Sequence, residues 1–302
     1  MSISKSCHLP FVLTLLVIFW TCQSSDSNVT STASEDPGTF PSELYPLLIT
    51  DDSRTIHQFI SAPKRIISLV PSATETLLSM DLGNNLVGRT EFDIATPEIR
   101  NLPSVGLGMN PDLEILLSLN PDLVIGFSGE SDTSITRHLK NSNITYFMIR
   151  PDKLEDAVEI IKKLSLITDR KFLGDSIILN INASLEIVQQ KIANKVRPRI
   201  AYVLGGEPPW VAGPGTYIHQ LIIAGGGQNI FDDLEHKYAP VSLEEFFVRK
   251  LDLILLTENT RLPNALKHLR TFTISSSVEI PGPGLGEAVF EIAHGIHPQV
   301  FP

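Results

Sequence analysis

Residues 110–126 have the sequence NPDLEILLSLNPDLVIG, and residues 240–256 repeat its pattern in degenerate form as PVSLEEFFVRKLDLILL. Each copy combines a short helical periodicity with an apolar run that is typical of a buried strand. Each copy also places a glutamate near the predicted start of the helix. Two such units, at matching places in the two halves of the chain, indicate two similar lobes that each present one acidic contact. The matching positions are Leu113, Glu114, Asp122, Leu123 and Ile125 in the first copy and Leu243, Glu244, Asp252, Leu253 and Leu255 in the second.

The segments around the first copy predict alternating strands and helices. RIISLV at residues 65–70 is apolar and rich in β-branched residues, which favours a buried strand. Pro71 opens the next helix, in which Ser72 and Glu75 have the spacing of a capping box. Strands that alternate with helices imply a mostly parallel sheet covered on both faces. We expect further strands at 86–88, 123–127 and 145–149 and a helix at 133–140.

The second half of the chain repeats this order of elements. A strand is predicted at 199–204, followed by a helix at 216–224 that the glycines at 225–227 end. After the second copy of the pattern come a strand at 271–275 and a last helix at 285–296. The two halves therefore predict two lobes built in the same way.

A long helical segment separates the two halves. Residues 154–195 keep a helical periodicity almost throughout, with a break near Thr168 and Asp169, and they are not rich in Gly or Ser as a flexible hinge would be. We therefore predict an α/β fold with two Rossmann-like lobes, mostly parallel sheets, a long rigid backbone helix and a ligand cleft between the lobes. The expected division is an N-terminal lobe at 64–165, a connecting helix at 166–198 and a C-terminal lobe at 199–302.

The N-terminus has the layout of an export signal. Residues 1–22 contain an apolar run at 9–20 that is too short to span a bilayer as a helix, and Cys22 follows it. A polar tether and lead-in occupies residues 23–63. This layout resembles a bacterial lipoprotein signal, so we expect an exported protein, periplasmic or at the cell surface, that is lipid-anchored at Cys22.

The cysteine count agrees with this interpretation. Cys7 would leave with the signal, so Cys22 would have no disulfide partner. Residues 19–21, Phe-Trp-Thr, are bulkier than the small residues usual before a lipidated cysteine, so plain secretion stays open as an alternative.

Composition and motifs oppose several classes of function. The net charge of −10 argues against a nucleic-acid surface, which needs clustered Lys and Arg. The glycines at 205–206 and 225–227 lack the spacing of a phosphate-binding loop, and we interpret them as a turn and a helix end. The sequence has no HExxH motif, paired-cysteine site or GxSxG elbow, so we favour a binding protein over an enzyme.

Three aromatic residues lie in predicted loops, two of them after strands. Phe92 follows the strand at 86–88, Trp210 follows the strand at 199–204, and Tyr238 precedes the second copy of the pattern. Ligands of α/β lobes collect at the carboxyl ends of strands, where aromatic contacts would hold a large, flat ligand. Packing of each aromatic residue on its own lobe is the alternative.

Several stretches resemble a known family. They are RIISLVPSATETLLSMDLG, LEILLSLNPDLVI, PPWVAGPGTYIHQLIIAGGGQNIF and PGPGLGEAVFEIAHGIHP. From about Lys64 to the C-terminus, the chain resembles the helical-backbone substrate-binding proteins of ABC importers for vitamin B12, haem and ferric siderophores, with B12-binding members nearest. The resemblance implies a metal chelate as the transported ligand, no resident cofactor, no catalysis, and a permease with its ATPase as partners. We expect a monomer.

The resemblance also assigns roles to individual residues. Glu114 and Glu244 match the glutamates that pair with permease arginines in this family, although the helix dipole alone would stabilise a glutamate at these positions. Phe92 and Tyr238 match aromatic B12 contacts, with Phe92 in place of a tyrosine. Residues 275–284, which include Ser277, match a segment that supplies polar contacts, but they contain no arginine.

The identity of the chelate stays open at this point. We expect a cobalt corrinoid first. Haem would need an axial ligand, for which Tyr238, His236 and His219 are the candidates. A ferric siderophore usually needs a cation in the cleft, for which Arg89 is the candidate.

Overall fold

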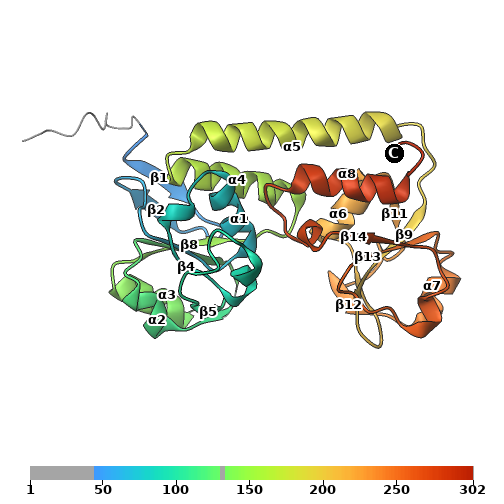
Figure 1. Cartoon of the computed structure of the whole chain (residues 1–302), viewed down its shortest axis with the longest axis horizontal. Coiled ribbons are helices and arrows are strands. Elements are labelled where there is room, and N and C mark those ends of the chain that lie inside the picture. Colours follow the sequence, from blue (N-terminus) through green and yellow to red (C-terminus); the bar gives the residue numbers. More distant parts are fainter. Residues whose placement is uncertain (1–43, 130–132, 302) are drawn as a thin grey trace, which may run out of the picture. The chain divides into compact units, whose positions relative to one another are not determined.

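A computed structural model describes residues 44–129 and 133–301 (Figure 1). Residues Ser42–Pro302 form one compact unit. The predicted signal, Cys22 and most of the tether lie outside the described residues. Among the residues that the structure describes, no helix is long and apolar enough to cross a membrane.

The N-terminal lobe contains a four-stranded parallel sheet with the order β4-β3-β7-β8. One face packs on α1 and α4 through a core that includes Ile66, Leu77 and Leu164, and the other packs on α2 and α3 through Ile67, Leu116 and Leu139. Three predicted strands are confirmed with the same bounds. The elements are β3 (Ile66–Ser68), α1 (Pro71–Ser79), η1 (Gly83–Asn85), β4 (Leu86–Gly88), η2 (Glu91–Ala95), β5 (Gly106–Leu107), β6 (Asn110–Pro111), α2 (Leu113–Ser118), β7 (Leu123–Phe127), α3 (Thr133–Asn141), β8 (Thr145–Ile149) and α4 (Leu154–Ile167).

One local prediction for this lobe is wrong, and one feature of it was not predicted. Helix α1 follows Val70 and has no side-chain cap, so Ser72 and Glu75 lie inside the helix and form no capping box. The lead-in ends in a β-hairpin of β1 (Leu47–Thr50) and β2 (Ile56–Phe59), which the sequence did not suggest. The hairpin is fixed by tertiary contacts, since the Asp51 carboxylate accepts a hydrogen bond from Met148 N at 3.1 Å.

The C-terminal lobe repeats this sheet and extends it. Strands β11, β9, β13 and β14 are parallel and correspond to β4, β3, β7 and β8, and β10 and β12 add an antiparallel pair beside the carboxyl half of β9. The elements are β9 (Arg199–Gly205), β10 (Trp210–Ala212), α6 (Tyr217–Ala224), β11 (Gln228–Asn229), β12 (Tyr238–Pro240), α7 (Leu243–Val248), β13 (Leu253–Thr257), η3 (Asn264–Leu266), β14 (Thr271–Ile274), η4 (Ser276–Glu279) and α8 (Leu285–Ile296). The expectation that Trp210 and Tyr238 lie in loops is therefore wrong.

The repeated aspartate makes the same contact in both lobes. The Asp122 carboxylate accepts a hydrogen bond from Arg65 N at 3.1 Å, and the Asp252 carboxylate accepts one from Arg199 N at 2.7 Å. Each arginine Nε also donates to a backbone carbonyl just after the helix of the repeat. Arg65 Nε donates to Asn120 O at 3.0 Å, and Arg199 Nε donates to Arg249 O at 2.8 Å. These bonds fix the start of the central strand of each lobe, which explains why the sequence pattern recurs.

Helix α5 (Lys171–Ile192) lies along both lobes (Figure 1). Leu173 packs on the N-terminal core, Val188 belongs to the C-terminal core, and Ile177 packs against both. The predicted break near Thr168 is confirmed, with Asp169 at a φ of 56°. The helical stretch is therefore two helices, α4 and the connecting helix α5.

Candidate functional site

The C-terminal lobe carries an aromatic cavity of about 500 Å³ that is lined by Leu204, Gly205, Gly206, Trp210 and Tyr238. In the antiparallel pair of β10 and β12, Trp210 lies opposite Pro240 and Tyr238 lies opposite Ala212, so the two aromatic side chains are diagonal neighbours on one face. They are 46% and 43% exposed. The cavity therefore presents two partly solvated aromatic rings at the carboxyl end of β9.

The Gly205-Gly206 turn supports this aromatic surface. Gly206 has a φ of 94°, and a Cβ at this position would lie 3.1 Å from the Trp210 indole and from the Pro208 carbonyl oxygen. A side chain would therefore displace the indole and strain the backbone. The interpretation of this glycine pair as a turn is confirmed.

Two carboxylates are fixed in the same lobe as the aromatic cavity, although neither lines it. The buried Tyr202 hydroxyl donates to Glu279 Oε1 at 2.6 Å, and Ser276 Oγ donates to Glu258 Oε1 at 3.0 Å. Burial raises the pKa of Tyr238, and the charges of Asp152 and Glu279 raise it further. Glu279 is thus close enough to act on the Tyr238 ring electrostatically, and both carboxylates are held in place as hydrogen-bond acceptors.

Sequence reasoning missed these two glutamates, although a signal was available. Glu258 directly follows β13, and Glu279 lies in η4, which follows β14. Hydrogen bonds from its own backbone N–H and from Ser276 lower the pKa of Glu258. Polar residues after parallel strands meet at one edge of a sheet, so their positions alone mark them as site candidates.

The structure does not place all predicted ligand contacts in this cavity. Phe92 lies in η2 of the N-terminal lobe and is 63% exposed. Ser277 is exposed in η4, where its Oγ lies 2.8 Å from Ser275 Oγ. Trp210 and Tyr238 share the cavity, whereas Phe92 and Ser277 are not among the residues that line it.

The suggestion of Arg89 as a cation in the cleft is wrong. Its side chain is buried, and its guanidinium donates to Thr90 O at 2.9 Å and Arg100 O at 3.1 Å. These bonds hold the chain around η2. Arg89 is thus a structural residue.

The three candidates for a haem ligand differ in position. Of Tyr238, His236 and His219, only Tyr238 lines the cavity. His219 Nδ1 lies 3.2 Å from the Asn229 amide nitrogen, and burial lowers the pKa of this histidine. In the part of the chain that the structure describes, no group of three or more His, Cys, Asp or Glu side chains is arranged to hold a metal ion.

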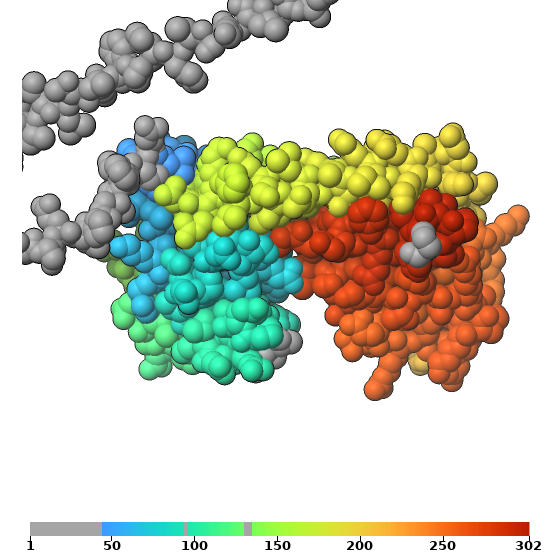
Figure 2. Space-filling view, turned by 45° about the horizontal axis from the view of Figure 1, so that its top comes forward, coloured from blue at the N-terminus to red at the C-terminus, as the bar shows by residue number. Residues whose placement is uncertain are grey.

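Direct contacts join the two lobes beside the cleft. Lys237 Nζ lies 2.6 Å from an Asp152 carboxylate oxygen, and the Gln220 side-chain oxygen accepts a hydrogen bond from Leu154 N at 2.7 Å. The surface is hollowed between the two lobes (Figure 2). The aromatic cavity therefore belongs to a lobe that faces a second lobe across an open space.

Comparison with known proteins identifies the family. A family model described as periplasmic binding protein matches residues 66–273. The chain belongs to the periplasmic binding protein family. It is 25% identical over 280 residues to an uncharacterised ABC transporter substrate-binding lipoprotein of Bacillus subtilis (strain 168), covering 86% of this chain and 88% of that protein. It is 26% identical over 196 residues to the vitamin B12-binding protein of Vibrio cholerae, covering 65% and 71% of the two chains.

Solved structures of periplasmic binding proteins share the fold. The haem-binding protein of Roseiflexus sp. RS-1, in apo form, superimposes with a TM-score of 0.69 at 20% identity, over 80% of this chain and 99% of that chain. This likeness concerns the fold alone. The family and the two-lobed α/β fold that the sequence resemblance implied are both confirmed.

The two repeated glutamates occupy equivalent, exposed places in this periplasmic binding protein. Glu114 lies in the first turn of α2 and Glu244 in the first turn of α7. Both helices lie at the ends of the lobes far from α5 (Figure 1). Hydrogen bonds from its own N–H and from Ser242 lower the pKa of Glu244. Each copy of the repeat thus places one exposed glutamate in the first turn of its helix.

Proposed function

We propose that this protein is the extracytoplasmic substrate-binding component of an ABC importer. It captures a flat metal chelate between its lobes and delivers it unchanged to a membrane permease. The family membership and the two-lobed fold with its backbone helix support this role. The relative in Bacillus subtilis is named a substrate-binding lipoprotein, which supports export and a lipid anchor at Cys22.

The cargo that fits the aromatic cavity best is a cobalt corrinoid. The single observation that carries this choice is the aromatic cavity lined by Trp210 and Tyr238. The same lobe also holds the carboxylates of Glu258 and Glu279 in place after β13 and β14. The rings would stack on a flat macrocycle, and the carboxylates would accept hydrogen bonds from the amide N–H groups at a corrinoid's edge. The 26% identity to a vitamin B12-binding protein also supports this assignment.

The same carboxylates disfavour the two other chelates. The carboxylates at the edge of haem would meet Glu258 and Glu279 as like charges. Burial raises the pKa of Tyr238, which opposes the phenolate form that would ligate iron. An anionic ferric siderophore would meet no exposed guanidinium at Arg89, which is buried and donates to the Thr90 and Arg100 carbonyls.

Removal of the negative charge of Glu279 tests this choice of cargo. Glu279→Gln removes the charge and keeps a hydrogen-bonding group for Tyr202, so we expect it to bind haem more tightly than the wild type while it still binds a corrinoid. Glu159→Gln is the matched control, because it removes one charge from the exposed face of α4. Equal haem affinity for the two variants, or loss of corrinoid binding in Glu279→Gln, would contradict the assignment.

An enzyme on a related fold is the alternative from another class. A binding protein should retain one corrinoid per chain through gel filtration and release it chemically unchanged. Chromatography of the released chelate makes the distinction, since a modified product would reject the proposal.

A further inference from the structure

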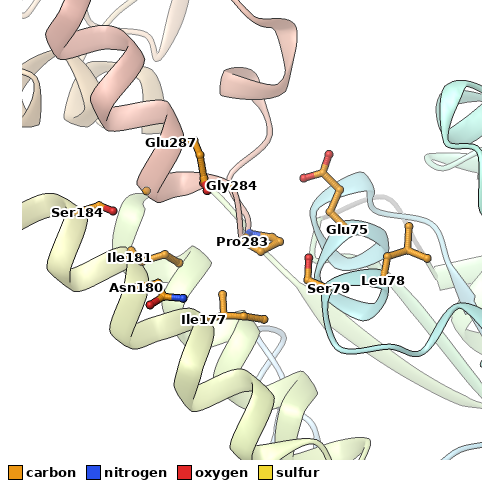
Figure 3. Close-up of a pocket in the computed structure, with 11 residues that line it drawn as sticks. Glu75, Leu78, Ser79, Ile177, Asn180, Ile181, Ser184, Pro283, Gly284 and Glu287 are labelled. Carbon is orange, nitrogen blue, oxygen red and sulfur yellow. The ribbon is translucent and has the colours of Figure 1, made fainter. Parts of the chain in front are cut away.

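A second cavity, of about 450 Å³, lies between the two lobes beneath α5 (Figure 3). The N-terminal lobe contributes Glu75 from α1, the C-terminal lobe contributes Gly284 and Glu287 at the start of α8, and α5 contributes Asn180 and Ser184. No Lys, Arg or His is among the residues that line this cavity. It therefore brings two carboxylates from different lobes to one space without a cation.

Glu75 lies directly against the other lobe. A Cβ on Gly282 would be 3.7 Å from Glu75 Oε2 and 3.5 Å from Ser72 O, so the 281–284 segment contacts this side of α1. Figure 3 shows Glu75 across from Pro283 and Gly284. Glu75 is thus part of the contact between the lobes.

The surroundings of Glu75 disfavour its charge. Burial and, to a smaller extent, the charge of Asp93 together raise the pKa of Glu75 to about 7. The other titratable groups near it are Tyr217 from α6 and Glu287 from α8, whereas α5 presents only uncharged side chains, both polar and apolar. Near neutral pH, a large part of the molecules therefore hold Glu75 in its neutral form.

Two buried hydroxyls near Glu75 lack partners. Ser72 Oγ and Tyr217 OH make no hydrogen bond in the part of the chain that the structure describes, and the two residues are 2% and 3% exposed. The charge of Glu75 contributes to a raised pKa of Tyr217, which shows that this hydroxyl is near the carboxyl group across the lobe boundary. Unpaired buried hydroxyls are costly, so two unsatisfied polar groups lie beside Glu75 where the lobes meet.

We propose that Glu75 is a proton-linked positioning residue that sets the spacing of the two lobes and thereby makes ligand affinity depend on pH. Neutral Glu75 packs against the 281–284 segment and keeps the lobes together. Ionised Glu75 faces Asp93 and Glu287 without a cation, so the lobes move apart by a few ångströms and water reaches the carboxylate. The effect on affinity rests on the proposed function, whereas the effect on lobe spacing does not.

The direction of the pH effect follows from proton linkage. With the lobes together, the pKa of Glu75 is raised from 4.5 to about 7. The protein with its lobes together therefore binds the proton more tightly than the protein with its lobes apart, in which water reaches the carboxyl group. It is therefore fully favoured below pH 4.5 and loses this advantage as the pH rises through 7. If lobe spacing and ligand binding were completely coupled, this pKa shift would change corrinoid affinity about 300-fold. The carboxyl group is partly exposed, so we expect corrinoid binding to be about tenfold weaker at pH 8.5 than at pH 5.5.

The spacing of the lobes can be measured directly in the protein without ligand. Neither of the two cysteines of the chain lies in the compact unit Ser42–Pro302, so Asn141→Cys and Ala265→Cys would introduce one spin label on each lobe. Both positions are exposed, at the end of α3 and in η3. We expect the distance between the labels to increase from pH 5.5 to pH 8.5 in the wild type, to stay constant in Glu75→Gln, and to increase as in the wild type in Glu287→Gln.

Two results would overturn the inference. One is a distance that does not increase with pH in the wild type, and the other is an equal increase in Glu75→Gln. If Glu75→Gln does not fold, Gly282→Ala replaces it, because its methyl group fits against Glu75 Oε2 at 3.7 Å and should shift the midpoint to higher pH. An unshifted midpoint in that variant would also reject the role of Glu75. A pH-dependent distance without any chelate binding would reject the proposed function alone.

Discussion

Removal of the indole of Trp210 should weaken corrinoid binding about 10-fold to 70-fold. Trp210 is 46% exposed at the cavity, and a tryptophan side chain carries about 150–250 Å², so roughly 100 Å² of ring is available to a ligand. At about 25 cal/mol per Å², complete coverage of this area contributes about 2.5 kcal/mol, and coverage of one ring face about half of that. These two limits give the stated range of affinity.

Isothermal titration calorimetry is the suitable assay for Trp210→Ala. Trp210 is the only tryptophan of Ser42–Pro302, so its substitution removes the tryptophan fluorescence that could otherwise report binding. Phe172→Ala is the matched control, because this aromatic residue is 84% exposed on α5 and lines neither cavity. A loss below twofold in Trp210→Ala, or an equal loss in Phe172→Ala, would refute the stacking role.

Three further predictions concern docking, the glycine turn and stability. Joint substitution of Glu114→Ala and Glu244→Ala should abolish transport in cells and leave corrinoid affinity unchanged in calorimetry, since both side chains are exposed and neither lines the aromatic cavity. Lost affinity would instead assign them to the cleft. Gly206→Ala should lower the free energy of unfolding in urea by about 1–2 kcal/mol and also weaken ligand binding, because its Cβ would lie 3.1 Å from Trp210; an unchanged protein would contradict the strain at this turn. Glu75→Gln should raise the free energy of unfolding by about 1–2 kcal/mol above pH 7 and change it little below pH 4.5. The reason is that the raised pKa of Glu75 makes wild-type stability fall as the pH rises. A gain that is the same at every pH would exclude titration of Glu75 as its cause.

The two lobes could be predicted from the repeated pattern because the repeated residues make the same tertiary contacts in both lobes. Asp122 and Asp252 each bind the backbone at the start of the central strand of their lobe, so the same local need arises twice. Strands such as Leu123–Phe127 and Thr145–Ile149 were found with their exact bounds, since buried parallel strands are continuous apolar runs.

The features that the sequence did not reveal depend on contacts between distant segments. Strands β10 and β12 have three residues each and exist because they pair beside β9. Ser72 and Glu75 have capping-box spacing, yet Val70 takes the N-cap position and Glu75 faces the other lobe. The sequence identifies Arg89 as a cation, but not that its side chain is buried and donates to two backbone carbonyls.

The most direct test of the central claim is a calorimetric titration of Ser42–Pro302 with cyanocobalamin, cobinamide, haem and a ferric hydroxamate. The cavity lined by Trp210 and Tyr238, in a lobe that also fixes the carboxylates of Glu258 and Glu279, predicts one tightly bound corrinoid per chain, with haem and the ferric siderophore bound at least tenfold more weakly. Tighter binding of haem or the ferric siderophore, or no binding of any chelate, would contradict the account.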